Sequence, residues 1–84
     1  MMYNEIRRLR SWCVANGIPC TIERLFDGFQ IHFADGADII QHKYSYGAEN
    51  GCVEPAGIDD EVDYSAVPLV EMEKILMKKY CKTS

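Results

Sequence analysis

The sequence lacks a long apolar stretch, and this absence removes membrane-spanning proteins from consideration first. No apolar run in the 84 residues approaches the roughly 18 residues that cross a bilayer. The opening segment, MMYNEIRRLR, is polar and charged, so it does not have the pattern of an export signal. A chain of this length has room for one domain, residues 1–84. We therefore expect a single soluble domain in the cytoplasm.

The cysteines and histidines lack the spacing of a metal site. The cysteines are Cys13, Cys20, Cys52 and Cys81, and no two of them form a C-x-x-C pair. His32 and His42 show no zinc-ligand spacing with each other or with the cysteines. Because disulfide frameworks belong mainly to exported proteins, we expect reduced and mostly buried thiols, with neither a metal nor a cofactor.

Basic charge is in deficit, which argues against a protein that coats nucleic acid. The formal net charge is −4, whereas non-specific binding to phosphates depends on many Lys and Arg contacts. Basic residues gather near the two ends of the chain: Arg7, Arg8, Arg10, Lys74, Lys78, Lys79 and Lys82. Residues 48–63 carry several acidic residues and no basic one. Either simple solvation or a partner of complementary charge accounts for these clusters.

Apolar residues at helical spacing predict two helices, one near each end. The first spans residues 4–16, with Asn4 as its N-cap and Gly17 as the left-handed residue that ends it. Its apolar face consists of Met2, Ile6, Leu9 and Cys13, with Trp12 on the flank. The second spans residues 65–81, and its apolar stripe consists of Leu69, Met72, Ile75, Leu76 and Tyr80. Acidic residues early and lysines late in this helix match its dipole.

Two Asp-Gly pairs predict a meander of three antiparallel strands. Asp27-Gly28 and Asp35-Gly36 each lie between strand-like residues, which favours two-residue turns of type I′. Each turn would then pair the residues that flank it, Phe26 with Phe29 and Ala34 with Ala37.

The alternation of side chains sorts this meander into two faces. The face expected in the core holds Cys20, Ile22, Phe26, Phe29, Ile31, Phe33 and Ile40. The face expected to meet water holds Thr21, Glu23, Leu25, Gln30, His32, Ile39 and Gln41. With both helices on the core face, the chain forms a two-layer α+β domain of order α-β-β-β-(β)-α.

Residues 44–64 form the long connection between the third strand and the second helix. A loop of about 20 residues is uncommon in a compact domain and usually carries function. Within it, Cys52–Glu54 predicts a short extra strand. The candidate interaction surface lies here and comprises Tyr44, Tyr46, Glu49, Asp59, Asp60, Glu61 and Asp63. Tyrosine suits protein interfaces, although packing beneath the loop is the alternative for both tyrosines.

A polar cluster in the same region offers a second kind of site. It comprises His42, Ser45, Cys52 and Glu54, which are residue types used in acid–base and nucleophilic catalysis. No catalytic-triad, phosphate-loop or dinucleotide-binding signature accompanies them, so we assign no catalytic residue. The structural alternative places His42 at the edge of the core and has Glu54 accept backbone N–H groups of the loop.

The segments that carry a family likeness lie within residues 20–57. They are the strand TIERLF before the first Asp-Gly pair, the triplet FQI after it, and the pattern D-I-I-x-H-x-x-S-Y-G at residues 38–47. Together they resemble small uncharacterised proteins encoded by phages and prophages of Gram-positive bacteria. That family has no established activity. The resemblance implies a phage-linked origin and a location in the bacterial cytoplasm.

Three functional hypotheses follow. The first is a non-enzymatic accessory protein that binds a host or phage protein through the candidate interaction surface. The second is a small hydrolase that uses Cys52 or Ser45 with His42. The third is nucleic-acid binding, which requires the early arginines and the late lysines to form one basic patch. A homodimer through the mixed sheet face or a free strand edge is compatible with all three.

Overall fold

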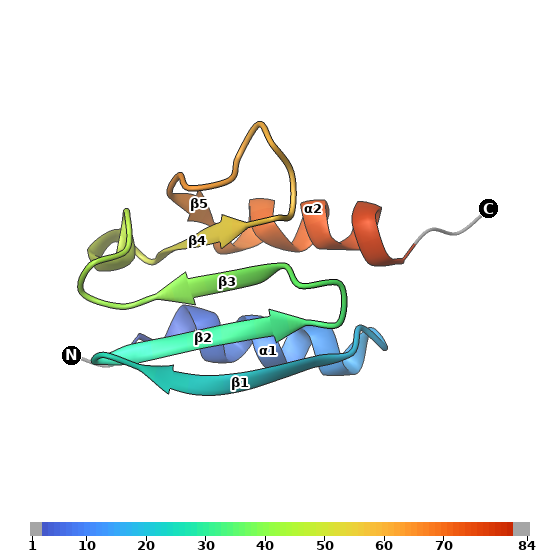
Figure 1. Cartoon of the computed structure of the whole chain (residues 1–84), viewed down its shortest axis with the longest axis horizontal. Coiled ribbons are helices and arrows are strands. Elements are labelled where there is room, and N and C mark those ends of the chain that lie inside the picture. Colours follow the sequence, from blue (N-terminus) through green and yellow to red (C-terminus); the bar gives the residue numbers. More distant parts are fainter. Residues whose placement is uncertain (1–2, 82–84) are drawn as a thin grey trace.

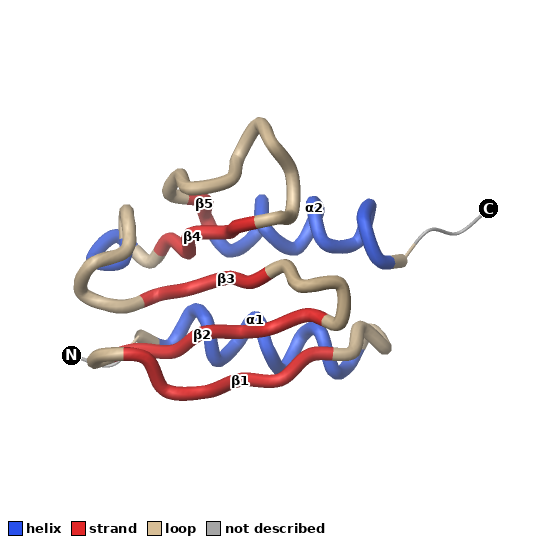
Figure 2. Tube along the Cα trace, in the orientation of Figure 1, coloured by secondary structure: helices blue, strands red, loops and turns tan. Residues whose placement is uncertain are grey.

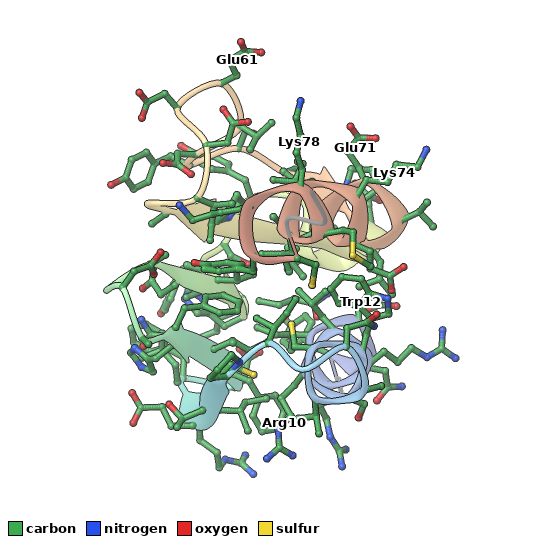
Figure 3. The ribbon with its side chains drawn as sticks, turned by 90° about the vertical axis from the view of Figure 1, so that its right-hand side faces the viewer. Arg10, Trp12, Glu61, Glu71, Lys74 and Lys78 are labelled. Atoms are coloured by element: carbon green, nitrogen blue, oxygen red, sulfur yellow. The ribbon has the colours of Figure 1, made fainter. Side chains whose placement is uncertain are left out.

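A computed structural model describes residues 3–81 of the chain. Its elements are α1 (Asn4–Ala15), β1 (Cys20–Leu25), β2 (Gly28–Phe33), β3 (Asp38–Gln41), η1 (Ala48–Asn50), β4 (Cys52–Ala56), β5 (Val67–Pro68) and α2 (Leu69–Tyr80). The strands form one antiparallel sheet in the order β1-β2-β3-β4-β5 (Figures 1 and 2). Both helices lie on one side of this sheet (Figure 3). The predicted α+β class and element order are therefore confirmed, with five strands instead of three.

The N-terminal end of α1 is held by a residue from the middle of the sheet. Tyr3 occupies the N-cap position in place of the predicted Asn4, and its side chain makes no cap hydrogen bond. Instead, the Ile6 N–H donates to Oε1 of Gln41 on β3 at 3.0 Å. Nε2 of Gln41 also donates to Glu5 at 3.1 Å. A long-range contact thus satisfies a backbone group that a local cap usually satisfies.

The C-terminal end of α1 follows the prediction. Gly17 has a φ of 72°, and the Ile18 N–H donates to the Cys13 carbonyl at 2.9 Å, as in a Schellman motif. The predicted apolar face is confirmed for its described members, Ile6, Leu9 and Cys13, which are fully buried. Met2 lies outside the described residues.

The first hairpin turns one residue earlier than predicted. Leu25 pairs with Gly28, so Phe26 and Asp27 form the turn. Only Phe26 of these two has a positive φ, of 56°, and the turn is therefore not of type I′. Gly28 lies in β2, where an added Cβ would meet the Gln41 carbonyl oxygen at 1.8 Å. The close approach of β3 explains this glycine.

The second hairpin has three loop residues instead of two. The Phe33 N–H donates to the Ala37 carbonyl at 2.9 Å, which leaves Ala34, Asp35 and Gly36 in the loop. The Gly36 N–H donates back to Phe33 at 3.1 Å, and Gly36 has a φ of 91°. This is the geometry of a hairpin loop whose last residue is left-handed.

The extra loop residue turns β3 over relative to the prediction. Ile39 and Gln41, which were expected to face water, are fully buried in the core. Ile31 pairs with Ile39 in the sheet, and Ile40 alternates to the opposite face. Phe26, which was expected in the core, lies instead in the earlier β1–β2 turn and is 62% exposed. A one-residue slip in register changes the face of every side chain on the strand.

The chain between β3 and α2 contains two strands. β4 confirms the extra strand predicted at Cys52–Glu54 and continues to Ala56. β5 was not predicted, because Val67 and Pro68 were assigned to the second helix. The residue before a proline favours extended backbone, so α2 begins only at Leu69.

The core lies between the sheet and the two helices. Its largest fully buried apolar side chains include Ile6, Leu9, Ile31, Ile39, Met72 and Leu76. On the open face of the sheet, cross-strand polar pairs join His32 with Glu23 and Gln30 with Asp38. Between residues 3 and 81, no helix is long and apolar enough to cross a membrane.

Candidate functional site

Exposed aromatic side chains gather where two neighbouring turns meet at one end of the sheet. Tyr44 and Tyr46 are 67% and 66% exposed on the segment that follows β3. Phe26, from the β1–β2 turn, is also exposed and packs edge-to-face on Tyr44, with ring centroids 4.9 Å apart. The buried His42 lies beneath this pair, 4.9 Å from Phe26 and 6.0 Å from Tyr44. We name Phe26, His42 and Tyr44 the aromatic cluster.

The segment below the aromatic cluster is fixed by its own hydrogen bonds. The Ser45 hydroxyl accepts the His42 N–H at 3.0 Å and donates to the His42 carbonyl at 2.9 Å. Nδ1 of His42 accepts the Tyr44 N–H at 3.0 Å. The histidine therefore has the structural position that was predicted as one alternative, at the edge of the core with bonds to the loop backbone.

Asp27 joins the two turns that carry the cluster. Its carboxylate accepts the Lys43 N–H at 2.8 Å and the Tyr3 hydroxyl at 3.2 Å. Desolvation acts to raise the pKa of Asp27, but the hydrogen bonds from Lys43 and Tyr3 outweigh it and hold that pKa below its usual value. The exposed rings thus stand on two turns that these hydrogen bonds join.

The predicted polar cluster does not assemble into a catalytic arrangement. The Ser45 hydroxyl bonds the backbone of His42 instead of its imidazole. Oε1 of Glu54 accepts the Tyr46 N–H at 2.9 Å, which confirms the backbone role expected for this carboxylate. Among residues 3–81, no hydrogen bond links Cys52 to His42. The nucleophile–base pair that a hydrolase requires is therefore not formed in the described part of the chain.

All four cysteines are free thiols, but only Cys13 is buried. The expectation of mostly buried thiols was therefore wrong for Cys20, Cys52 and Cys81, which are partly exposed. Desolvation, with a smaller contribution from the neighbouring Cys20, raises the pKa of Cys13 to about 12. Within the described residues, no group of three or more His, Cys, Asp or Glu side chains is arranged to hold a metal ion.

The predicted acidic run divides into inward and outward residues. The Asp63 carboxylate accepts the N–H groups of Gly57, Ile58 and Asp59 at 2.9–3.1 Å. Oδ1 of Asp59 accepts the Glu61 N–H at 3.0 Å. Asp63 is therefore used by the backbone of its own loop, and it does not present its carboxylate as the prediction assumed.

Asp60 and Glu61 are exposed, and Figure 3 shows Glu61 at the tip of the loop. Glu49 is exposed on η1. In Figure 1, the loop that follows β4 lies beyond the edge of the sheet, whereas η1 and the segment after β3 lie at one end of the strands. The candidate interaction surface thus separates into two regions. Tyr44, Tyr46 and Glu49 lie at one end of the strands, and the acidic residues lie in the loop between β4 and β5, which we name the acidic loop.

The two basic clusters do not form one patch. Figure 3 places Arg10 at the opposite side of the molecule from Lys74 and Lys78. Lys82, the last member of the predicted cluster, lies outside the described residues. Nucleic-acid binding through both clusters would require one joint basic patch. The described residues of the two clusters do not form one.

Phe26 was missed as a site residue. The predicted register placed it in the core, and the same register set Arg24 opposite the buried Ile31. That mismatch between a charged and a core side chain was the available signal. In the structure, Arg24 pairs with Phe29 instead.

No known protein family, curated protein or solved structure matches this chain. The resemblance to phage and prophage proteins therefore stays a prediction. Function has to be argued from the surface of the molecule itself.

Proposed function

We infer that the chain is a non-enzymatic protein-binding domain whose aromatic cluster, with Tyr46 beside it, contacts the partner. The observation that carries this inference is the edge-to-face pair of Phe26 and Tyr44, each more than three-fifths exposed on an ordered base. Exposed aromatic rings that adjoin one another on a rigid support are typical of interface hot spots.

The hydrogen bonds beneath the rings also support a role of the aromatic cluster in protein binding. Ser45, His42 and Asp27 fix the two turns without contributing to the exposed area of the rings. A partner would therefore meet side chains that have already lost much of their freedom, which lowers the entropic cost of association. The phage-linked origin implied by the resemblance makes a host or phage protein the expected partner.

The test is affinity capture from a lysate of a Gram-positive bacterium, with nuclease treatment and identification of the bound proteins by mass spectrometry. Two variants remove the rings: Tyr44→Ala and Phe26→Asn. Asparagine is chosen for Phe26 because it tolerates the positive φ of 56°. A hot-spot contribution predicts at least roughly ten-fold weaker binding for each variant.

Tyr64→Asn is the matched control. Tyr64 is 67% exposed and also has a positive φ, of 65°, but it lies in the acidic loop. A protein that is retained by Tyr64→Asn and lost by Phe26→Asn and Tyr44→Ala would support the proposal. A protein that all variants retain would show that the aromatic cluster is not the binding surface.

A further inference from the structure

A groove of about 940 Å³ lies between α1 and the β1–β2 hairpin. Its lining includes four arginines, Arg7, Arg8, Arg10 and Arg24, and we name it the arginine groove. The acidic residue in the lining, Asp27, is already engaged by Tyr3 and the Lys43 backbone. The groove is therefore strongly basic, in a chain whose net charge is −4.

The arginines have no acidic partner within residues 3–81. The ion pairs of this part of the chain are His32–Glu23 and Lys79–Asp35. Arg7 and Arg10 are three residues apart on α1, where like charges destabilise a helix. The like charges cost the helix some stability, and an anion bound from outside would offset that cost.

A second groove differs from the arginine groove in the signs of its charges. It has a volume of about 390 Å³ and is lined by residues of both signs: Asp59, Glu71, Lys74, Lys78 and Lys79. In Figure 3, Lys74 and Lys78 lie on the same side as Glu71. Here acidic and basic side chains share the lining in similar numbers, whereas four arginines face one aspartate in the arginine groove.

Phe29 brings arginines from two elements together. The guanidinium groups of Arg7 on α1 and Arg24 on β1 each lie 5.8 Å from the centroid of the Phe29 ring. Such cation–π contacts restrain long side chains without neutralising them. Two planar hydrogen-bond donors are therefore held near one ring, and carboxylate groups match such donors well.

The arginine groove adjoins a free edge of the sheet. β1 is the terminal strand and pairs only with β2 in the described chain. Ile22 and Arg24 alternate onto the helix-covered face and line the groove. An extended peptide that paired with β1 would direct every second side chain toward the arginines.

We propose that the arginine groove binds an extended acidic segment of a partner protein, which adds a strand to β1 and directs alternate carboxylates at the arginines. The main-chain pairing supplies affinity, and the arginines select for acidic side chains. Single-stranded nucleic acid fits less well. A nucleic acid has no peptide backbone to pair with the free edge of β1, and the guanidinium groups of Arg7 and Arg24 already lie over the Phe29 ring, each 5.8 Å from its centroid.

The experiment measures binding by fluorescence anisotropy with a short labelled peptide in which glutamate alternates with valine. A glutamine–valine peptide and an oligothymidylate are the comparison probes. The double variant Arg7→Gln/Arg24→Gln removes two groove charges, and Lys74→Gln/Lys78→Gln removes two charges from the opposite side. Hydrogen exchange of the β1 amides, followed by NMR, reports strand addition.

We expect the glutamate peptide to bind the wild type and the lysine variant equally, and to bind the arginine variant at least roughly ten-fold more weakly. Binding should also weaken with added salt and slow exchange of the outward amides of β1. Four results would overturn the proposal: no binding, equal binding of the glutamine peptide, equal loss in both double variants, or tighter binding of oligothymidylate. Phe26→Asn should leave this binding unchanged, so this test and the test of the aromatic cluster can fail separately.

Discussion

Among single residues, Gln41 bonds groups that lie far from it in the sequence. Its side chain is fully buried, accepts the Ile6 N–H and donates to Glu5. Ile6 is also fully buried, so water cannot replace the bond. The start of α1 therefore depends on the presence of this amide.

We predict that Gln41→Ala lowers the free energy of unfolding by about 2–3 kcal/mol, because a buried N–H loses its acceptor and a cavity is left behind. Urea unfolding followed by circular dichroism measures this change. Gln30→Ala is the control, since Gln30 lies on the open face of the sheet, and it should cost less than about 1 kcal/mol. Equal losses in the two variants would contradict the role assigned to Gln41.

At this scale the sequence revealed part of the candidate site. Tyr44 and Tyr46 were predictable as interface residues, because they fall in a long polar connection. Phe26 and Gln41 were not, since the place of Phe26 depends on where the first turn lies and the face of Gln41 depends on the number of residues in the second turn. An Asp-Gly pair predicts that a turn is present, but it does not fix whether the glycine lies in the turn or in the strand.

At the scale of elements, the two hairpins use similar dipeptides in different ways. In the second hairpin, Gly36 is the left-handed residue that closes a three-residue loop. In the first, Gly28 is a strand residue, and its missing side chain lets the backbone of β3 approach. This approach brings the start of β2 against the end of β3.

We predict that Gly28→Ala destabilises the protein by about 3 kcal/mol or more, because the new Cβ would lie 1.8 Å from the Gln41 carbonyl oxygen and a strand must move. Thermal unfolding followed by circular dichroism is the measurement. Gly36→Asn serves as the control, since nothing lies within 4 Å of an added Cβ there and asparagine tolerates a positive φ. The close approach would be disproved if Gly28→Ala were as stable as Gly36→Asn.

Elements with an extended apolar pattern were predicted well. Both helices and the strand at Cys52–Glu54 were found within a few residues of their expected bounds. β5 was missed because two residues carry no periodicity, and only the backbone preference before Pro68 indicates it. The role of Asp63 was missed. Its carboxylate accepts three backbone N–H groups, but nothing in the sequence distinguishes it from an aspartate that faces solvent.

At the scale of the whole molecule, the end of α2 is bonded to the β2–β3 hairpin. The Tyr80 hydroxyl donates to both carboxylate oxygens of Asp35, at 2.9 Å and 3.0 Å, and its ring stacks on Phe33. The Ala37 N–H, the Tyr80 hydroxyl and the nearby Lys79 hold the pKa of Asp35 below its usual value, against the effect of burial. Elements from both halves of the chain meet at this carboxylate.

Because the pKa of Asp35 is lower in the folded state, its contribution to stability is present above the unfolded value of 3.8 and is lost as the pH falls through the folded value. We predict that Asp35→Asn is less stable than the wild type at neutral pH, by about 1 kcal/mol or less for so exposed a group. This difference should shrink as the pH falls below about 4, because the carboxyl group is protonated there in the unfolded chain and at still lower pH in the folded protein.

Urea unfolding of both proteins across this pH range is the measurement. Asp60→Asn is the control, because Asp60 is exposed and accepts no hydrogen bond within the described chain. A difference between wild type and Asp35→Asn that stayed constant with pH would show that the charge of Asp35 does not stabilise the fold.

The class and layering of the whole fold followed from the number and order of amphipathic segments. The distribution of charge could not be predicted in the same way, because it depends on how each helix is rotated about its axis. Arg10 and Lys78 were predicted as candidates for a joint patch, yet they lie on opposite sides of the molecule (Figure 3). Rotation of a helix is set by side-chain packing, and a sequence pattern specifies it only to within a wide apolar stripe.

The Gln41 side chain that caps the start of α1 also bears on when the first helix can become stable during synthesis. Ile6 and its acceptor Gln41 are separated by 35 residues. At about 5–20 residues per second, the ribosome adds the acceptor roughly 2–7 s after the donor. The first helix is therefore made long before its end can be capped, and an isolated helix of 12 residues is marginal in water. We therefore expect α1 to become stable only after β3 has been synthesised.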